Sequence, residues 1–329
     1  MTPLLRVSDL RTYYVGFGGT RVVKAVDGVS FSVEAGETFG LVGESGCGKT
    51  TTCHAIVRLL SPSGRIVSGS IELEGEDLVK KSQREMRVIR GRRIATILQD
   101  PMASLDPLFS IYDQVAEPAY YHRSFRGRRL RQRVTELLAA VRIPSPERRM
   151  RDFPHQLSGG MRQRVVGAIA QAGGPRLIIA DEPTTNLDVT IQLQYLNLLK
   201  DLQRATGVAL IFVTHNLGIV AKMCDRVGVM YAGKIVEMQS VRGLFYRARH
   251  PYTRALLDSI PKLGVRQPLY GIPGQPPDLS ALPAGCAFHP RCRRAIDRCR
   301  VEEPSQHSLN GDGTVRCWLP IEEEAAARG

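Results

Sequence analysis

The segment from Gly43 to Thr50 constrains this chain more than any other. It reads Gly43-Glu-Ser-Gly-Cys-Gly-Lys-Thr50, follows the apolar run Thr38–Val42, and leads into a stretch of helical character over 51–60. Glycines let consecutive backbone N–H groups close around phosphate oxygens, and the start of a helix adds partial positive charge. This pattern of strand, glycine-rich turn and helix predicts a nucleotide phosphate site formed by Gly43, Ser45, Gly46, Cys47, Gly48, Lys49, Thr50 and Thr51.

Side chains in this segment have the chemistry that a nucleoside triphosphate requires. Lys49 is predicted to reach the β- and γ-phosphates, and the Thr50 hydroxyl to join a Mg²⁺ shell. A second acidic element follows the apolar run Leu177–Ala180, where Asp181 and Glu182 come directly after the run. Ligands of open α/β sheets bind at the carboxyl ends of the strands. We therefore assign Asp181 to the Mg²⁺ shell and Glu182 to general-base catalysis.

The order of apolar runs predicts an α/β fold in which helices cover a sheet. Strands are expected at 38–42, 94–98, 177–180, 210–213 and 227–231, several of them apolar on both faces as in central parallel strands. A helical lobe is expected over about 100–170. Within it, apolar residues recur at helical spacing, so 128–142 is predicted to be an amphipathic helix that buries Leu130, Val134, Leu137, Leu138 and Val141.

The amino-acid composition of the chain changes near residue 248, where prolines become frequent. Proline removes backbone donors and prevents long helices, so we place a boundary there. Residues 1–247 are expected to form the nucleotide-binding domain, and residues 248–329 a small, loop-rich unit.

Charge and hydropathy limit the cellular setting. The chain has 45 Lys and Arg against 32 Asp and Glu, a formal net charge of +13, and its basic residues form several short stretches. Most such stretches are solvated helix faces, although anionic lipid or nucleic acid is an alternative partner. No apolar run approaches the ~18 residues of a membrane helix, and the start lacks a signal peptide's apolar region. The sequence predicts a cytosolic chain, associated with a membrane at most through partners.

Further motifs identify a family. The stretch Leu157-Ser-Gly-Gly-Met161 resembles the signature motif of ABC ATPases, and it precedes the strand that carries Asp181. The family's other motifs also have counterparts here, in the family's order. The resemblance implies that Ser158, Gly159 and Gly160 contact nucleotide, Gln99 is the Q-loop glutamine and an Mg²⁺ ligand, Asp188 with Asn186 forms the D-loop, His215 is the switch histidine, and Tyr14, or its neighbour Tyr13, stacks on adenine.

The chain is most similar to the ATPase subunits of oligopeptide and dipeptide importers. This resemblance rests on four segments and on a C-terminal cysteine pattern, and it covers almost the whole chain: 99–107, 153–164, 181–190, 250–253 and Cys286-x5-Cys292-x6-Cys299-x17-Cys317. It implies a P-loop NTPase core of the ABC type that hydrolyses ATP to energise peptide import. Import of another solute, such as nickel or glutathione, is an alternative. A soluble ABC ATPase acting on nucleic acid is a further one, although no base-reading module is recognisable.

The same resemblance implies an assembly. Lys49 of one ATPase subunit and the Ser158–Gly160 region of another would sandwich one γ-phosphate, and the second subunit is expected to be a related, non-identical chain. Two permease subunits and an extracytoplasmic solute-binding protein complete such a system, which places this chain on the cytoplasmic face of the inner membrane, with no nucleic-acid partner. The segment after Gln99 and the helical lobe are expected to contact the permeases. Cys47, Asn186 and Asn216 stand where the family usually has Ser or Gly, Ala and Asp.

The four C-terminal cysteines need their own explanation. Cys286, Cys292, Cys299 and Cys317 lie within a proline-rich segment that has few core residues, which favours a fold organised by metal. Physics alone leaves zinc and an iron–sulfur cluster open, although these spacings depart from the tight pairs usual for zinc. A reducing cytosol disfavours disulfides. Some peptide-importer subunits carry a cluster at such cysteines, so the resemblance favours iron–sulfur, of the four-iron four-sulfur type.

Overall fold

The computed structural model describes residues 2–100, 104–185, 187–261, 271–309 and 313–319. The chain divides into two compact units, each assembled from separate segments. The first unit comprises Met1–Leu4, Val33–Thr38 and Lys80–Val213, and the second comprises Leu5–Ser32, Phe39–Val79 and Thr214–Gly329. The domain boundary expected near residue 248 stays a prediction.

Parallel strands form the centre of the first unit. Strand β7 (Leu177–Asp181) pairs in parallel with β6 (Ile94–Ile97) on one side and with β8 (Ala209–Thr214) on the other. Every residue of β7 and β8 is buried, as expected for strands that are apolar on both faces. The strands expected at these positions are confirmed.

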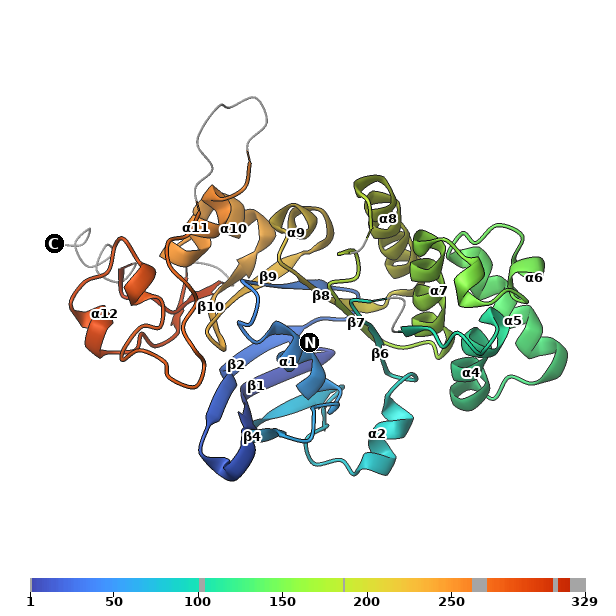
Figure 1. Ribbon diagram of the computed structural model, residues 1–329, viewed down its shortest axis with the longest axis horizontal. Helices are drawn as coiled ribbons and strands as arrows, with labels where there is room; N and C mark the ends of the chain where they lie inside the picture. Colours follow the sequence, from blue (N-terminus) through green and yellow to red (C-terminus); the bar gives the residue numbers. More distant parts are fainter. Residues whose placement is uncertain (1, 101–103, 186, 262–270, 310–312, 320–329) are drawn as a thin grey trace. The chain divides into compact units, whose positions relative to one another are not determined.

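Several helices accompany these strands in the described part of the first unit. They are α2 (Gln83–Ile89), α4 (Ile111–Arg123), α5 (Gly127–Ala140), α6 (Pro146–Arg149), α7 (Gly159–Ala172), α8 (Val189–Thr206) and the 3₁₀ turn η2 (Pro154–Gln156). Helices α4, α5 and α7 pack against one another (Figure 1). Helix α5 buries the predicted apolar stripe, but it ends at Ala140 rather than at 142, because Arg142 has a left-handed φ of 58°.

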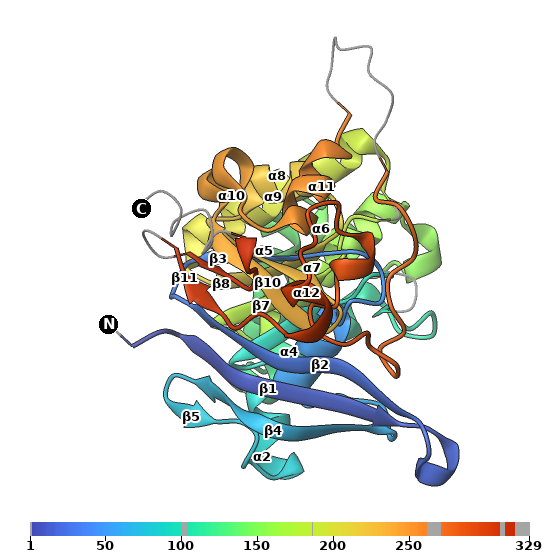
Figure 2. The same cartoon turned by 90° about the vertical axis from the view of Figure 1, so that its left-hand side faces the viewer.

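The second unit contains an antiparallel sheet that the sequence patterns did not predict. Its strand order is β2 (Val22–Val33), β1 (Leu5–Val15), β4 (Gly64–Leu73) and β5 (Glu76–Asp77), as seen in Figure 2. A second group of strands holds β3 (Thr38–Val42) parallel to β9 (Arg226–Tyr231). Antiparallel pairing then continues from β9 through β10 (Lys234–Ser240) and β12 (Thr314–Val315) to β11 (His307–Ser308).

Short helices complete this unit. They are α1 (Lys49–Ile56), α9 (Leu217–Met223), α10 (Val241–Arg247), α11 (Pro251–Asp258), α12 (Arg298–Val301) and the 3₁₀ turns η1 (Phe17–Gly19) and η3 (His289–Arg291). The helix expected over 51–60 is shorter than predicted and ends at Ile56, because Arg58 has a left-handed φ of 52°. The proline-rich tail, meaning the described residues from 271 onward, packs on the rest of this unit: Phe288, 2% exposed, contacts the rings of Tyr231 and Tyr252.

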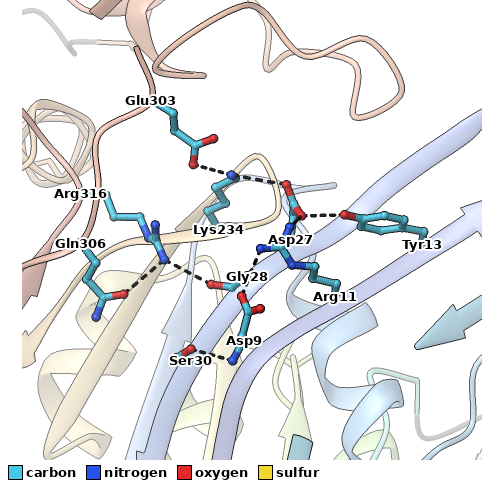
Figure 3. A network of polar contacts seen from close by, with 10 residues as sticks. All are labelled: Asp9, Arg11, Tyr13, Asp27, Gly28, Ser30, Lys234, Glu303, Gln306 and Arg316. Atoms are coloured by element: carbon cyan, nitrogen blue, oxygen red, sulfur yellow. Dashed lines mark hydrogen bonds and ion pairs between the residues drawn. The ribbon is translucent and has the colours of Figure 1, made fainter. Parts of the chain in front are cut away.

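Polar contacts also tie the tail to the strands of this unit. Asp27 on β2 accepts a hydrogen bond of 2.7 Å from the Tyr13 hydroxyl and pairs with Arg11 at 3.1 Å and with Lys234 at 3.4 Å (Figure 3). Lys234 also pairs with Glu303 of the tail. The tail therefore shares a charged network with β1, β2 and β10.

Candidate functional site

The phosphate loop of the second unit connects β3 to α1, as predicted. Its glycines are required by the backbone: Gly43 has a φ of 156° and Gly48 a φ of 109°. A Cβ atom at Gly43 would lie 2.2 Å from the Met230 carbonyl oxygen, and one at Gly48 would lie 2.2 Å from that of Ala25. No larger residue fits at either position without movement of the backbone.

Lys49 lies against this loop. Its Nζ donates hydrogen bonds to the carbonyl oxygens of Gly43 at 2.8 Å and Glu44 at 3.0 Å, and the residue is only 6% exposed. Cys47 is buried beside it, with its Sγ 3.8 Å from Nζ, and burial raises the pKa of this thiol. The Cys47 side chain thus points into the protein, whereas the ammonium of Lys49 lies against the backbone of the loop that would receive phosphate.

Other predicted nucleotide residues surround the loop within the second unit. Ser45, Gly46 and Thr50 are exposed and Thr51 is half-buried. The Tyr14 hydroxyl lies 3.4 Å from the Thr51 hydroxyl, whereas the Tyr13 hydroxyl is bound to Asp27. Tyr14 is therefore the tyrosine beside the phosphate loop, and its proposed stacking on adenine stays a prediction.

His215 and Asn216 follow β8. His215 is exposed. Asn216 is the N-cap of α9, where its side-chain oxygen accepts hydrogen bonds from the N–H groups of Gly218 at 2.9 Å and Ile219 at 3.4 Å. Asn and Asp are equally good caps, which explains why asparagine is accommodated here.

The acidic residues of the first unit stand at the carboxyl end of β7. Asp181 is the last residue of the strand and is 6% exposed, and Glu182 follows with a left-handed φ of 45°. The Glu182 Oε2 atom accepts hydrogen bonds from Gln99 Nε2 at 3.4 Å and from Thr185 Oγ1 at 3.0 Å. Gln99 and Glu182, 83 residues apart in sequence, are therefore in contact.

The signature segment caps a helix. Ser158 Oγ accepts a hydrogen bond of 3.4 Å from the Met161 N–H, and α7 begins at Gly159. Asp188 caps α8 in the same way, accepting from the Ile191 N–H at 3.0 Å. A Cβ atom at Gly160 would lie 2.7 Å from Ile191 Cγ2, so the start of α7 closely approaches the start of α8. Asn186 lies outside the described residues.

All four tail cysteines line one small cavity. The side chains of Cys286, Cys292, Cys299 and Cys317 surround it. Burial raises the pKa of Cys317 to about 12 and that of Cys286 to about 11. Among the residues that the structure describes, no group of three or more His, Cys, Asp or Glu side chains has the arrangement of a metal site.

Sequence patterns did not predict one set of contacts at the phosphate loop. Glu44 occupies a variable position of the loop pattern, yet its carboxylate binds Arg291 and its N–H donates to the Tyr252 hydroxyl. Both partners lie more than 200 residues away in sequence. Local spacing carries no signal for contacts over such a separation.

Within the described residues, no helix is long and apolar enough to cross a membrane.

Comparisons with known proteins agree with this geometry. Residues 26–185 match the family model described as ABC transporter, and residues 236–299 match the C-terminal region of oligopeptide/dipeptide transporters. The second match includes Cys286, Cys292 and Cys299 and ends before Cys317.

Two relatives and one solved structure are similar over long stretches. The dipeptide transport ATP-binding protein DppD of Bacillus subtilis is 46% identical over 97% of this chain and 95% of its own length. The oligopeptide transport ATP-binding protein OppD of the same organism is 47% identical over 97% of this chain and 89% of its own.

The ATP-binding cassette MJ0796, in a dimeric structure with ADP and phosphate, is 26% identical. It covers 73% of this chain and 99% of its own, with a TM-score of 0.64. This chain thus belongs to the ABC ATPases, in the family of oligopeptide and dipeptide transport ATP-binding proteins.

Proposed function

We propose that this chain hydrolyses ATP to drive the import of dipeptides or oligopeptides through separate permease subunits. The observation that carries the proposal is the nearly full-length similarity to dipeptide and oligopeptide transport proteins, which extends beyond the ATPase motifs into the tail. A generic ATPase would share the motifs alone.

The residues suit this reaction chemically. Lys49 would attract the phosphates, and Glu182, held by Gln99 and Thr185, would accept a proton from the attacking water. His215 is proposed to position the γ-phosphate. Thr50, Gln99 and Asp181 offer oxygen atoms, the ligand type that Mg²⁺ prefers, and bound Mg²⁺ would neutralise phosphate charge. Thr50, an exposed residue at the start of α1, fits that role.

Dimerisation would complete the site. The exposed signature residues Ser158 and Gly159 start a helix whose N-terminal N–H groups favour an anion. We assign them, with Gly160 and Asp188, to the nucleotide of a partner ATPase, which is proposed to be a related, non-identical chain. Loss of the bridging γ-phosphate would then loosen the dimer, a population shift that permeases convert into alternating access.

Purification from membranes tests the function. We expect the chain to co-purify from the cytoplasmic face of the inner membrane with two permease subunits and a second ATPase. Peptide presented by the extracytoplasmic binding protein should stimulate its ATP hydrolysis. Stimulation by nickel or glutathione instead of peptide would reassign the solute. Salt-sensitive binding of DNA or RNA without permeases would refute transport.

We also propose that the four tail cysteines hold an iron–sulfur cluster of the four-iron four-sulfur type, with zinc as the alternative. The supporting observation is that all four thiols line one cavity although they are spread over residues 286–317. We expect a structural role, because ATP hydrolysis needs no electron.

Anaerobic purification with metal and sulfide analysis distinguishes the two metals. A cluster predicts about four irons per chain with visible absorption, which Cys292→Ser removes. Cys224→Ser, which changes a cysteine outside the cavity, serves as the control and should leave the iron in place. One equivalent of zinc without iron would refute the cluster.

A further inference from the structure

One arginine of the tail, Arg291, binds the phosphate loop. Arg291 Nη1 donates to Glu44 Oε2 at 2.7 Å, and Nη2 donates to Glu44 Oε1 at 3.0 Å. This is a bidentate ion pair, the strongest arrangement that arginine and a carboxylate can form. It joins two residues that are 247 positions apart within the second unit.

Arg291 is held in place by its surroundings. Its side chain is 5% exposed, and its Nε donates to the Pro273 carbonyl oxygen at 2.8 Å. Its Nη1 lies 3.4 Å from the Tyr231 hydroxyl. The hydrogen bonds to Glu44 raise the pKa of Arg291 above its ordinary value. Removing one partner of such a buried ion pair strongly destabilises the folded protein, because the other charge is left buried without compensation.

On the loop side, Glu44 connects this arginine to the phosphate-binding lysine. Its N–H donates to the Tyr252 hydroxyl at 2.9 Å, and its carbonyl oxygen accepts from Lys49 Nζ at 3.0 Å. Three atoms or groups of one loop residue are therefore fixed: carboxylate, amide and carbonyl. Tyr252 itself is fully buried and packs on Tyr231.

We propose that Arg291 is a positioning residue for ATP binding, which neutralises Glu44 and fixes the loop backbone that carries Lys49. Without the arginine, an uncompensated carboxylate would stand in a loop built to bind phosphate anions. The proposal rests on the ATPase activity of the family and is independent of which solute is carried and of which metal the cysteines bind.

Arg291→Met in the purified complex is the first test. The variant should weaken ATP binding about tenfold, with kcat at saturating ATP nearly unchanged, because the catalytic residues keep their own contacts. Displacement of a fluorescent nucleotide measures the dissociation constant, and steady-state hydrolysis separates KM from kcat. Arg298→Met is the matched control: Arg298 lies in the same tail, stacks on Trp318 and pairs with Glu302, so ATP binding should stay at the wild-type value.

A second substitution separates this role from a general effect on folding. Removing the negative charge with Glu44→Gln in the Arg291→Met background should restore most of the lost affinity, because no unpaired charge then remains. A damaged tail would not be repaired by a change in the loop. Arg291→Lys, which keeps the charge but not the fork, should fall between the wild type and Arg291→Met. Wild-type affinity in Arg291→Met, or failure of Glu44→Gln to restore binding, would overturn the proposal.

Discussion

Glu182 combines an unusual backbone with a polar environment. Its φ of 45° turns the chain sharply after β7, and its carboxylate receives hydrogen bonds from Gln99 and Thr185. Non-glycine residues in this conformation cluster at functional sites, where surrounding contacts hold them. The side chain is thereby kept at the carboxyl end of the strand, where ligands of α/β sheets bind.

Replacing Glu182 with Gln should abolish steady-state hydrolysis while ATP binding persists. The amide keeps the shape of the side chain but cannot take a proton, and general bases contribute about 10²–10⁴-fold to rate. Phosphate release and nucleotide binding by the assembled transporter measure the two effects. Glu136→Gln, an exposed carboxylate on α5, is the control with normal turnover. The catalytic base of the partner ATPase is replaced as well, so that the partner cannot sustain turnover by itself. Near wild-type turnover of this doubly substituted transporter would reject the role of Glu182.

Tyr14 and Tyr13 differ in the hydrogen-bond partners of their hydroxyl groups. Tyr14→Ala should weaken ATP binding through the loss of an aromatic face worth ~1–3 kcal/mol. Tyr13→Ala should leave affinity close to wild type and lower stability instead, because Tyr13 donates to Asp27. Nucleotide titration and thermal unfolding of both variants measure this. The reverse pattern would place the adenine on Tyr13.

At the scale of elements, apolar runs predicted β3, β6, β7, β8 and β9, because strands buried on both faces have no polar alternation to obscure them. The antiparallel sheet was missed. Strand β4 exposes most of Gly64–Ser70, so its sequence resembles a loop. Strands β11 and β12 have two residues each, which is too short for any periodic signal.

The candidate site likewise has residues that could be predicted from the sequence and contacts that could not. Local sequence patterns predicted the loop and acidic residues, and the family resemblance implied the signature residues. The Arg291–Glu44 pair and the shared cavity of the four cysteines depend on long-range packing. Cysteine spacing indicated that the thiols act together, but the arginine between two of them carried no distinguishing pattern.

The network that joins β1, β2 and β10 should make part of the stability depend on pH. Burial alone would raise the pKa of Asp27, but the Tyr13 hydrogen bond and the charges of Lys234 and Arg11 outweigh it and hold the pKa below its usual 3.8. Because the folded pKa is the lower one, this stabilisation is complete above the unfolded pKa. It is lost as the pH falls through the folded value.

Asp27→Asn should therefore lower the free energy of unfolding by about 1–3 kcal/mol at pH 7, with a smaller difference at acidic pH. Denaturant unfolding across pH 3–7 measures it. Asp201→Asn breaks an exposed pair with Arg142 and should cost at most about 1 kcal/mol. A loss for Asp27→Asn that is equal at every pH would contradict the electrostatic explanation.

At the scale of the whole molecule, the family relationship and the site chemistry support one proposal: ATP hydrolysis with Glu182 as the general base drives peptide across a membrane. The most direct test is ATP-dependent uptake of a labelled peptide by vesicles that contain this chain, its partner ATPase, the permeases and the binding protein. We predict uptake that requires ATP and falls together with hydrolysis when Glu182 and its counterpart in the partner are replaced by Gln. Uptake that persists in those variants, or hydrolysis that no peptide stimulates, would contradict the account.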